Sequence, residues 1–497
     1  MAAPARSPSL VPSPSPALRL GFALLAGGAA LALGTAAGMG TSRALLIAGV
    51  VGPFVILLTL ARPHWAVTLY TVIVYADILS VLTKFYDLPQ LARFAGVLLL
   101  SAVLGYRLLI QRGKLVGDEM TWWMIGYAAV VALGLIYARD RDLVQLNLID
   151  FSRSLITYLV VINIITSRAR LRIVLWALVG MATVLAGLTI FQAATGQYDN
   201  NFGGFAVYRI SGISGDDEAP RPGGTFGDAN YYGQALLVLL PVALYFALER
   251  KRQIERLAGA TCSAILIAAV VFTYSRGDAL ALGGILVAAL ILKRPSPAVL
   301  LAGGVALIVL LPLLPANYVS RLTTIVSAFQ GDTDTIYNEY SIRGRAGAIQ
   351  AAIAMFLDHP ITGVGRENYP LYQLQYLEGS SLAYKSQGIP PHDLYLEIAA
   401  EHGLIGLAFF AGFFLGLGRA LWEARRRFLA VADADGAALA AWLAIMVGGW
   451  LMSSLFLHGA YLYMLWLQVA LVIALRQLAR TPNSAPAGYT LEEGRES

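Results

Sequence analysis

The stretch "SRARLRIVLWALVGMATVLAGLTIF", residues 167–191, joins three arginines to nineteen consecutive uncharged and mostly apolar residues. A helix needs about 20 such residues to cross the hydrocarbon core of a bilayer. Similar apolar runs recur from residue 18 to residue 477. They are continuously apolar rather than alternating, which favours membrane-spanning helices over a membrane barrel.

The composition supports the same class. Of 497 residues, 58% are hydrophobic and 13% are charged, whereas a soluble globular protein carries roughly 25% charged residues. We therefore predict an all-α polytopic membrane protein with about 12–14 transmembrane helices. The predicted spans begin near Ala17, Ala44, His64, Leu91, Thr121, Val144, Leu171, Asn230, Leu257, Gly277, Ser296, Leu394, Ala438 and Ala460.

The net charge of +6 is interpreted as an excess of cytoplasmic Lys and Arg rather than as a site for nucleic acid. Alternate connections between the predicted spans are strongly basic, so we expect them, and both termini, to be cytoplasmic. These connections hold Arg107, Arg112, Lys114, Arg168, Arg170, Arg172, Arg250, Lys251, Arg252, Arg256, Lys293, Arg294, Arg419, Arg425, Arg426, Arg427, Arg476 and Arg480. The single cysteine, Cys262, excludes an internal disulfide and says nothing about the redox compartment.

The same alternation divides the chain into seven predicted segments. Two disordered cytoplasmic tails (1–17 and 478–497) enclose transmembrane segments 18–191, 229–316 and 392–477, with outer loops 192–228 and 317–391 between them. The second outer loop is expected to be partly helical. Loops of that length usually carry function.

Four arginines that are not cytoplasmic anchors fall on the outer side, together with one histidine. They are Arg221, Arg276, Arg343 and Arg345, with His392 at the start of a predicted helix. Arginine binds phosphate through a planar fork of donors and stays charged, and a neutral imidazole accepts a proton near physiological pH. The pattern is consistent with a site for a phosphate-bearing substrate. The alternatives are a histidine that only caps a helix and arginines that lie at the membrane interface or pair with Asp228 or Asp278.

Other outer residues allow two interpretations each. Asp332 and Asp334 could hold a divalent metal, but a solvated loop is the favoured interpretation and no metal is predicted. The outer tyrosines fit either an interfacial aromatic belt or stacking against sugar rings. These tyrosines are Tyr231, Tyr232, Tyr274, Tyr369, Tyr372, Tyr376, Tyr384 and Tyr395. Within the spans, Asp150 and Arg153 lie three apart and are expected to pair.

The pattern at His392 resembles the O-antigen ligase and polymerase superfamily of bacterial envelope proteins. Ligases of that family carry His, a small polar residue, nine variable residues, Gly, two more residues and a small residue. The counterparts here are His392, Asp393, Gly403 and Gly406. Three further stretches are similar to family segments: "RPGGTFGDANYYG" (221–233), "YSRG" (274–277) and "FLDHPITGVGRENY" (356–369). Asp393 departs from the usual Asn, Ser or Gln, and its charge is expected to raise the pKa of the imidazole.

The resemblance implies a membrane-embedded, GT-C-like, inverting and metal-independent glycosyltransferase without a cofactor. Its donor would be a glycan on undecaprenyl diphosphate, and its acceptor a hydroxyl of lipid A-core, of a glycan or of another molecule. The site would face the periplasm or exterior of a bacterial inner (plasma) membrane. Arg221, Arg276, Arg343 and Arg345 would hold the diphosphate, His392 would be the general base, and Asn230, Asp393, Tyr274, Tyr395 and Glu401 would support them.

Two alternatives stay open at this point. A polymerase that joins repeat units on the carrier lipid would use the same donor and similar chemistry. A solute transporter, such as the bicarbonate carriers proposed among relatives, should instead place polar or broken helices near the middle of the membrane. The polar residues here cluster at the outer edge of the predicted spans, which favours transfer chemistry.

Overall fold

The computed structural model describes residues 62–86, 115–214, 217–298, 301, 340–378, 390–459 and 462–481, with side chains at all of them except 210–219, 340–343 and 462. The helices are α3 (Pro63–Tyr75), α4 (Ile78–Tyr86), α6 (Glu119–Tyr137), α7 (Arg141–Ile164), α8 (Arg168–Thr195), α9 (Ala229–Glu249), α10 (Gln253–Phe272), α11 (Arg276–Lys293), α15 (Tyr340–Asp358), α16 (Tyr369–Tyr376), α18 (Leu394–Ala430), α19 (Ala434–Ser453) and α20 (Leu462–Arg480). The short 3₁₀ helix η2 (Phe202–Gly204) precedes the strands β1 (Val207–Ser214) and β2 (Asp217–Gly224). The predicted all-α membrane class is confirmed.

Seven of the described helices are long and apolar enough to cross a membrane: α6, α7, α8, α9, α10, α18 and α19. Ten of the fourteen predicted spans correspond to described helices. The four that begin near Ala17, Ala44, Leu91 and Ser296 lie wholly or mostly outside the described residues. The predicted total of about 12–14 transmembrane helices therefore stays a prediction.

The span expected near His64 is not a straight helix. It consists of α3 and α4, which meet at an angle of 63°. Asp77 lies at the break with a φ of 51°, in the left-handed region that Asp tolerates better than most residues. Its carboxylate accepts a hydrogen bond from Ser80 Oγ at 2.7 Å, and this local bond replaces helical continuity.

Polar residues start most of the helices. Asp118 and Thr121 form a capping box at the start of α6, and Asp228, Ser275 and Asp393 cap α9, α11 and α18. Each cap satisfies backbone N–H groups that have no partner inside the helix. Helices α9 and α20 lie at the centre of the bundle, where their side chains are buried almost along the whole length.

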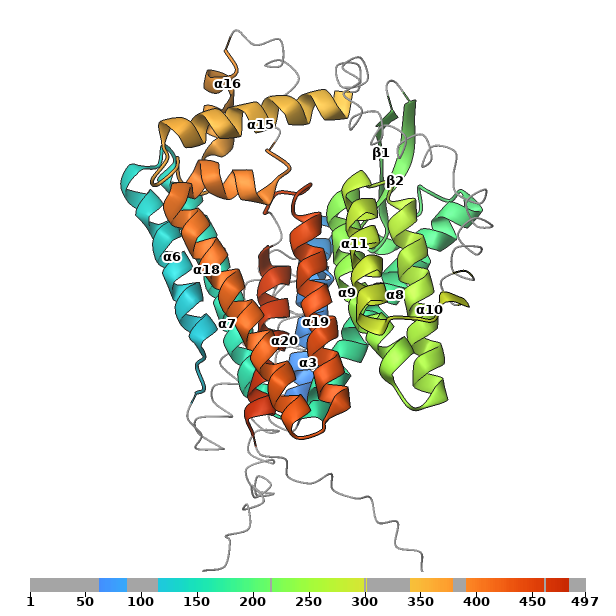
Figure 1. The fold of residues 1–497 in the computed structure, drawn as a ribbon. Coiled ribbons are helices and arrows are strands. Elements are labelled where there is room, and N and C mark those ends of the chain that lie inside the picture. Colours follow the sequence, from blue (N-terminus) through green and yellow to red (C-terminus); the bar gives the residue numbers. More distant parts are fainter. Residues whose placement is uncertain are drawn as a thin grey trace, which may run out of the picture.

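Ion pairs tie the basic connections together at one end of the bundle (Figure 1). The pairs are Arg168–Asp433, Arg250–Asp435, Arg476–Asp118 and Lys293–Glu249. They join the ends or starts of α6, α8, α9, α11, α19 and α20. The connections that were predicted to be cytoplasmic therefore lie at one end of the bundle. This end is called the basic end below.

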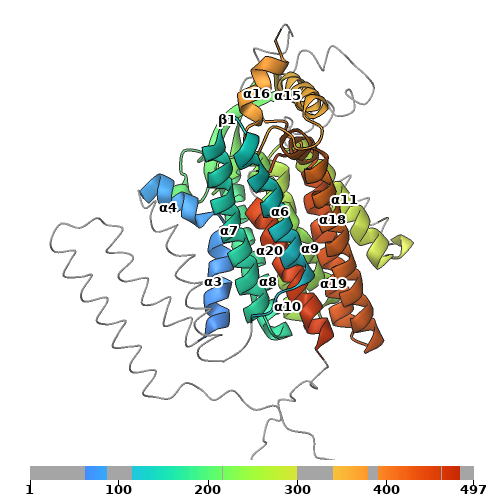
Figure 2. The same ribbon diagram turned by 90° about the vertical axis from the view of Figure 1, so that its left-hand side faces the viewer.

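The opposite end carries the β1–β2 hairpin and the helices α15 and α16 (Figures 1 and 2). Helix α15 lies across the bundle and packs Ala351, Ala352 and Met355 against α16 and α18, so the second outer loop is partly helical, as predicted. The hairpin was not predicted. Pro220 and Pro222 in β2 argue against a strand when only the sequence is considered. A two-stranded ribbon nevertheless tolerates proline, because each strand has one unpaired edge.

Helix α18 is interrupted at Gly403, where φ is 61° and ψ is −155°. Residues 360–365 fill the interruption with backbone hydrogen bonds: Leu404 N–H donates to Pro360 O at 2.7 Å, and Val364 N–H to Ala400 O at 2.9 Å. A Cβ at Gly403 would lie 2.4 Å from the Ile361 carbonyl carbon. Two of the stretches that resemble the family thus form one packed unit, and glycine is required where they touch.

We expect Gly403→Ala to destabilise the protein by about 3 kcal/mol, because alanine is strained at this φ and overlaps the Ile361 backbone. The measurement is the temperature at which the detergent-purified protein loses its monodisperse peak. Gly418→Ala is the matched control, since Gly418 lies in the same helix with no atom within 4 Å of its Cβ position. Equal transition temperatures for the two variants would contradict this role of Gly403.

Candidate functional site

His392 lies at the non-basic end of the bundle, immediately before the residue that caps α18. It has a φ of 49°, and its ring meets the ring of His458 edge-to-face, with centroids 5.0 Å apart. His458 in turn meets Tyr231 of α9 with centroids 5.3 Å apart. The Nδ1 atoms of both histidines are buried and have no hydrogen-bond partner among the described residues. Such a nitrogen is suited to accept a proton from a bound hydroxyl.

Arg221 lies within β2 at the same end of the bundle. Its Nε donates to the carbonyl of Thr273 at 3.0 Å, and Nη2 donates to Asn230 Oδ1 at 3.1 Å. Asn230 directly precedes Tyr231, which contacts His458 through its ring. Three elements far apart in the chain (β2, the α10–α11 turn and the start of α9) therefore fix the guanidinium at the same end of the bundle as the two imidazoles.

Arg276 begins α11 on the same turn. Burial lowers the pKa of Arg221, the carboxylates of Asp228 and Asp278 oppose this, and the neighbouring charge of Arg276 lowers it further. Two neighbouring guanidiniums offer planar groups of donors that suit a phosphate-bearing ligand, and the two carboxylates already offset part of their charge.

The other predicted diphosphate ligands lie in α15. Arg345 is near enough for its charge to lower the pKa of His392. Arg343 lies two residues earlier in α15, and its side chain is outside the described part of the chain. Tyr274 lies near Tyr198 and Tyr208 of the first outer segment and not beside the histidines.

Three predicted supporting residues have structural contacts elsewhere. The Asp393 carboxylate accepts the backbone N–H groups of Tyr395 and Leu396 at 2.9 and 3.0 Å and caps α18. The Tyr395 hydroxyl donates to Leu451 O at 2.8 Å and joins α18 to α19. Glu401 accepts from Arg366 at 2.9 Å. None of the three side chains is directed at His392.

The expected effect of Asp393 on His392 is wrong. The pKa of His392 is lowered to about 3, first by burial and then by the charges of Arg345 and His458. Asp393 does not raise it, because its carboxylate is taken up by the helix cap. His392 is therefore a neutral imidazole over the physiological pH range in the unloaded protein.

Segment 453–459, between α19 and α20, connects these elements. Ser453 Oγ donates to Asp278 at 2.9 Å, the Leu394 N–H donates to Ser454 O at 3.0 Å, and Tyr231 Oη donates to His458 O at 3.3 Å. The segment thus holds the starts of α9, α11 and α18 together around the histidine pair.

Sequence reasoning missed His458 and Arg209. His458 is one of five histidines and interrupts an apolar stretch, which was a usable signal. Arg209 is the cross-strand neighbour of Arg221 in the hairpin, and its exposed guanidinium lies over Gly227. No local pattern indicated it, because the hairpin itself was not predicted.

The family comparison matches a substantial part of the region that contains this geometry. The profile described as O-Antigen ligase matches residues 261–411. That match includes the α10–α11 turn with Arg276, the α15 helix with Arg345, and His392. This part of the chain is similar to the O-antigen ligase family. No curated protein matched the chain in a separate comparison.

Arg221, Asn230 and His458 lie outside the matched residues; Arg221 contacts Thr273 and His458 contacts His392 within them. Among the described residues there is no group of three or more His, Cys, Asp or Glu side chains that could hold a metal ion. Asp332 and Asp334, the pair considered above for a metal, lie outside the described residues. The interpretation that they belong to a solvated loop without a metal stays a prediction.

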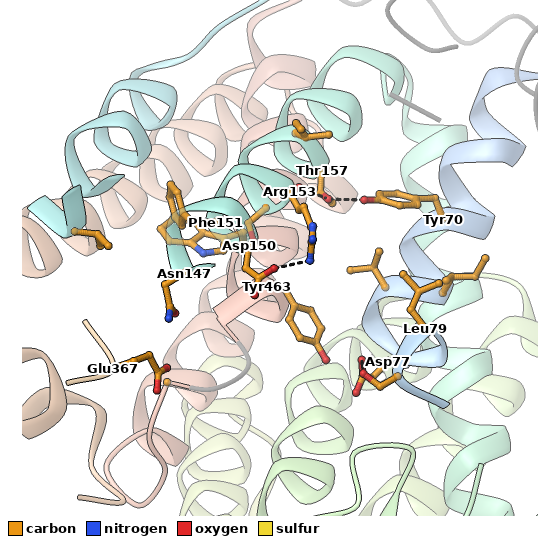
Figure 3. Close-up of a pocket in the computed structure, with 18 of the residues that line it drawn as sticks. Tyr70, Asp77, Leu79, Asn147, Asp150, Phe151, Arg153, Thr157, Glu367 and Tyr463 are labelled. Carbon is orange, nitrogen blue, oxygen red and sulfur yellow. Dashed lines mark hydrogen bonds and ion pairs between the residues drawn. The ribbon is translucent and has the colours of Figure 1, made fainter. Parts of the chain in front are cut away.

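A cavity of about 520 Å³ lies next to the histidine pair, between the bent pair α3–α4, α7 and the start of α20. Figure 3 shows Asp77 and Tyr463 on one side of it and Asp150 with Arg153 on another. Gly459, the neighbour of His458, lines its wall. The predicted Asp150–Arg153 pair is present.

Proposed function

We propose that this protein transfers a glycan from a polyprenyl diphosphate lipid, such as undecaprenyl diphosphate, to an acceptor hydroxyl. The observation that carries the proposal is that Arg221, Arg276 and His392 lie at the same end of the bundle, opposite the basic end, with Arg345 near enough to act on His392. The positive-inside rule then puts the reaction on the outer face of the membrane, where a bacterial inner-membrane enzyme meets lipid-borne glycans.

The chemistry follows from the neutral imidazole and the fixed guanidiniums. His392 takes the proton of the acceptor hydroxyl as its oxygen attacks the anomeric carbon of the donor sugar. The bond from that carbon to the phosphate oxygen breaks, and the diphosphate leaves with the bonding electrons. Arg221 and Arg276 stabilise the charge of the leaving diphosphate, and Arg345, which acts on His392, is a further candidate for this role. Attack opposite the leaving group inverts the anomeric carbon.

Two acceptors fit this chemistry. A ligase would use lipid A-core or another non-carrier hydroxyl, and a polymerase would use a second glycan on the carrier lipid. The His392 motif favours the ligase. A transporter has one observation in its support, because the break between α3 and α4 beside a cavity is typical of transporter sites.

The test uses purified full-length protein in lipid nanodiscs with lipid-linked glycan repeat units, with and without lipid A-core. A single adduct that requires the core supports a ligase, and a ladder formed without the core supports a polymerase. Full activity in chelator is expected, because no catalytic step here uses a metal. Absence of any transfer, together with solute uptake by sealed vesicles, would overturn the proposal in favour of a transporter.

The rate of transfer should depend on pH differently before and after the donor binds. In the free enzyme the lowered pKa of His392 keeps the imidazole neutral, so kcat/KM should show no acid limb near the ordinary histidine value of about 6.5. A bound diphosphate stabilises the imidazolium, so the acid limb of kcat should lie at higher pH than that of kcat/KM.

The variant Arg345→Gln tests this assignment. Removing that positive charge raises the pKa of His392, so the acid limb of kcat/KM should move to higher pH. Steady-state rates between about pH 2 and pH 9 are needed to measure both limbs, because the pKa of His392 is lowered to about 3 in the free protein. An unchanged kcat/KM profile in Arg345→Gln would exclude Arg345 as a neighbour that controls the base.

A further inference from the structure

The cavity beside the histidine pair reaches deep into the bundle. Asp150 and Arg153 line it and lie about 13 and 18 Å along α7 from its first residue, at 1.5 Å per residue. Their side chains are 67% and 48% exposed, although α7 is a candidate membrane span. Charged groups at such depth face water-filled cavities rather than lipid. The cavity is therefore a polar, hydrated space.

The charges that line this cavity are balanced. Three of its lining side chains are acidic and three are basic: Asp77, Asp150 and Glu367, and Lys84, Arg153 and Arg366. Arg153 is paired with Asp150, and Arg366 is buried among three glutamates. A diphosphate is bound best where cationic side chains are not already paired with carboxylates. The cavity therefore suits an electrically neutral polar ligand.

The remaining lining residues indicate what kind of neutral ligand this is. Tyr127, Tyr463 and Trp466 present aromatic rings, and flat apolar faces with polar edges suit sugar rings. Asn147 and the carboxylates offer acceptors, and the amide also offers donors, for hydroxyl groups. The volume lies within the usual range of about 300–1,000 Å³ for small-molecule sites.

We propose that this cavity binds the carbohydrate chain of the acceptor. The inference rests on the proposed function and adds a substrate site to it. Gly459 lines the cavity, and its N–H donates to the Glu397 carboxylate, which also binds Arg366. The next residue, His458, lies against His392. A sugar in the cavity would therefore lie next to the segment that carries His458 and, through it, close to His392.

Binding is measured first, without donor, on the full-length protein. The probes are a lipid-free oligosaccharide released by mild acid from the envelope glycan of the same organism, and sugar-free undecaprenyl diphosphate. Asn147→Ala and Asp150→Asn should each weaken oligosaccharide binding by about tenfold and leave undecaprenyl diphosphate binding unchanged. Asp142→Asn is the matched control, because it makes the same change on the same helix outside the cavity.

Steady-state rates then show whether the sugar in the cavity belongs to the acceptor or to the donor. The expected result is an acceptor KM raised about tenfold by Asn147→Ala with kcat retained. A raised donor KM instead would overturn the acceptor assignment. Unchanged oligosaccharide binding in both cavity variants would overturn the site itself.

The variant His392→Asn distinguishes this inference from the proposed function. It should lose transfer but keep oligosaccharide binding. If the wild-type protein binds the oligosaccharide through Asn147 and Asp150 but never transfers glycan, the proposed function fails and the carbohydrate site stands. If transfer occurs without any effect of the cavity variants, the carbohydrate site fails and the proposed function stands.

Discussion

Replacing His392 by asparagine is expected to lower the rate of glycan transfer by about 100- to 10,000-fold, the usual contribution of a general base. Asparagine is the informative substitution because it tolerates the left-handed φ of 49° at this position and keeps a polar side chain. It cannot take up a proton from the acceptor hydroxyl. The loss should therefore appear in kcat, while protein level and membrane insertion stay unchanged.

The matched control is His359→Asn. His359 lies at the same end of the bundle, is exposed, and contacts Tyr372 rather than the histidine pair. Transfer by this variant should equal that of the wild type. The measurement is the initial rate of adduct formation by purified protein at saturating donor. A His392→Asn protein that transfers at the wild-type rate would remove the proposed base.

Replacing Arg221 by glutamine is expected to lower kcat/KM for the lipid donor by about 100-fold. Losing one member of a buried, charged recognition pair costs about 3 kcal/mol, and each 1.4 kcal/mol corresponds to a factor of ten. Arg221→Lys should also be impaired, because lysine cannot keep the fork that reaches the Thr273 carbonyl and Asn230 together. Arg276→Gln should weaken use of the same donor.

Arg139→Gln is the control for these arginine variants. Arg139 is exposed at the same end of the bundle, donates to Leu371 O and lies over the Tyr372 ring. Titration with radiolabelled lipid-linked glycan separates donor binding from turnover. Because Arg221 also ties the hairpin to α9 and α10, thermal stability is measured in parallel. A stable Arg221→Gln protein with normal donor use would exclude the phosphate role.

The sequence predicted the location of some site residues correctly and that of others poorly. Arg221, Asn230, Arg276, Arg345 and His392 were placed on one side of the membrane by charge alternation, and the structure puts them at one end of the bundle. Their catalytic and binding roles stay proposals. For Asp393, Tyr395 and Glu401, nearness in sequence to His392 was a poor guide, because successive helical side chains point in different directions.

The sequence by itself determined the helical membrane class, because long uncharged runs can satisfy their backbone groups in a bilayer only as helices. It also determined several helix starts, through caps such as Asp228 and Asp393, and the common end of the basic connections. Only the tertiary structure decided the partners of each side chain. His458 meets His392 across 66 residues of chain, and Arg221 meets Thr273 across 52. Likewise, the break at Asp77 opens a cavity only because α7 and the start of α20 pack against it. Such contacts depend on how distant helices pack and which face each one presents, which no local pattern encodes.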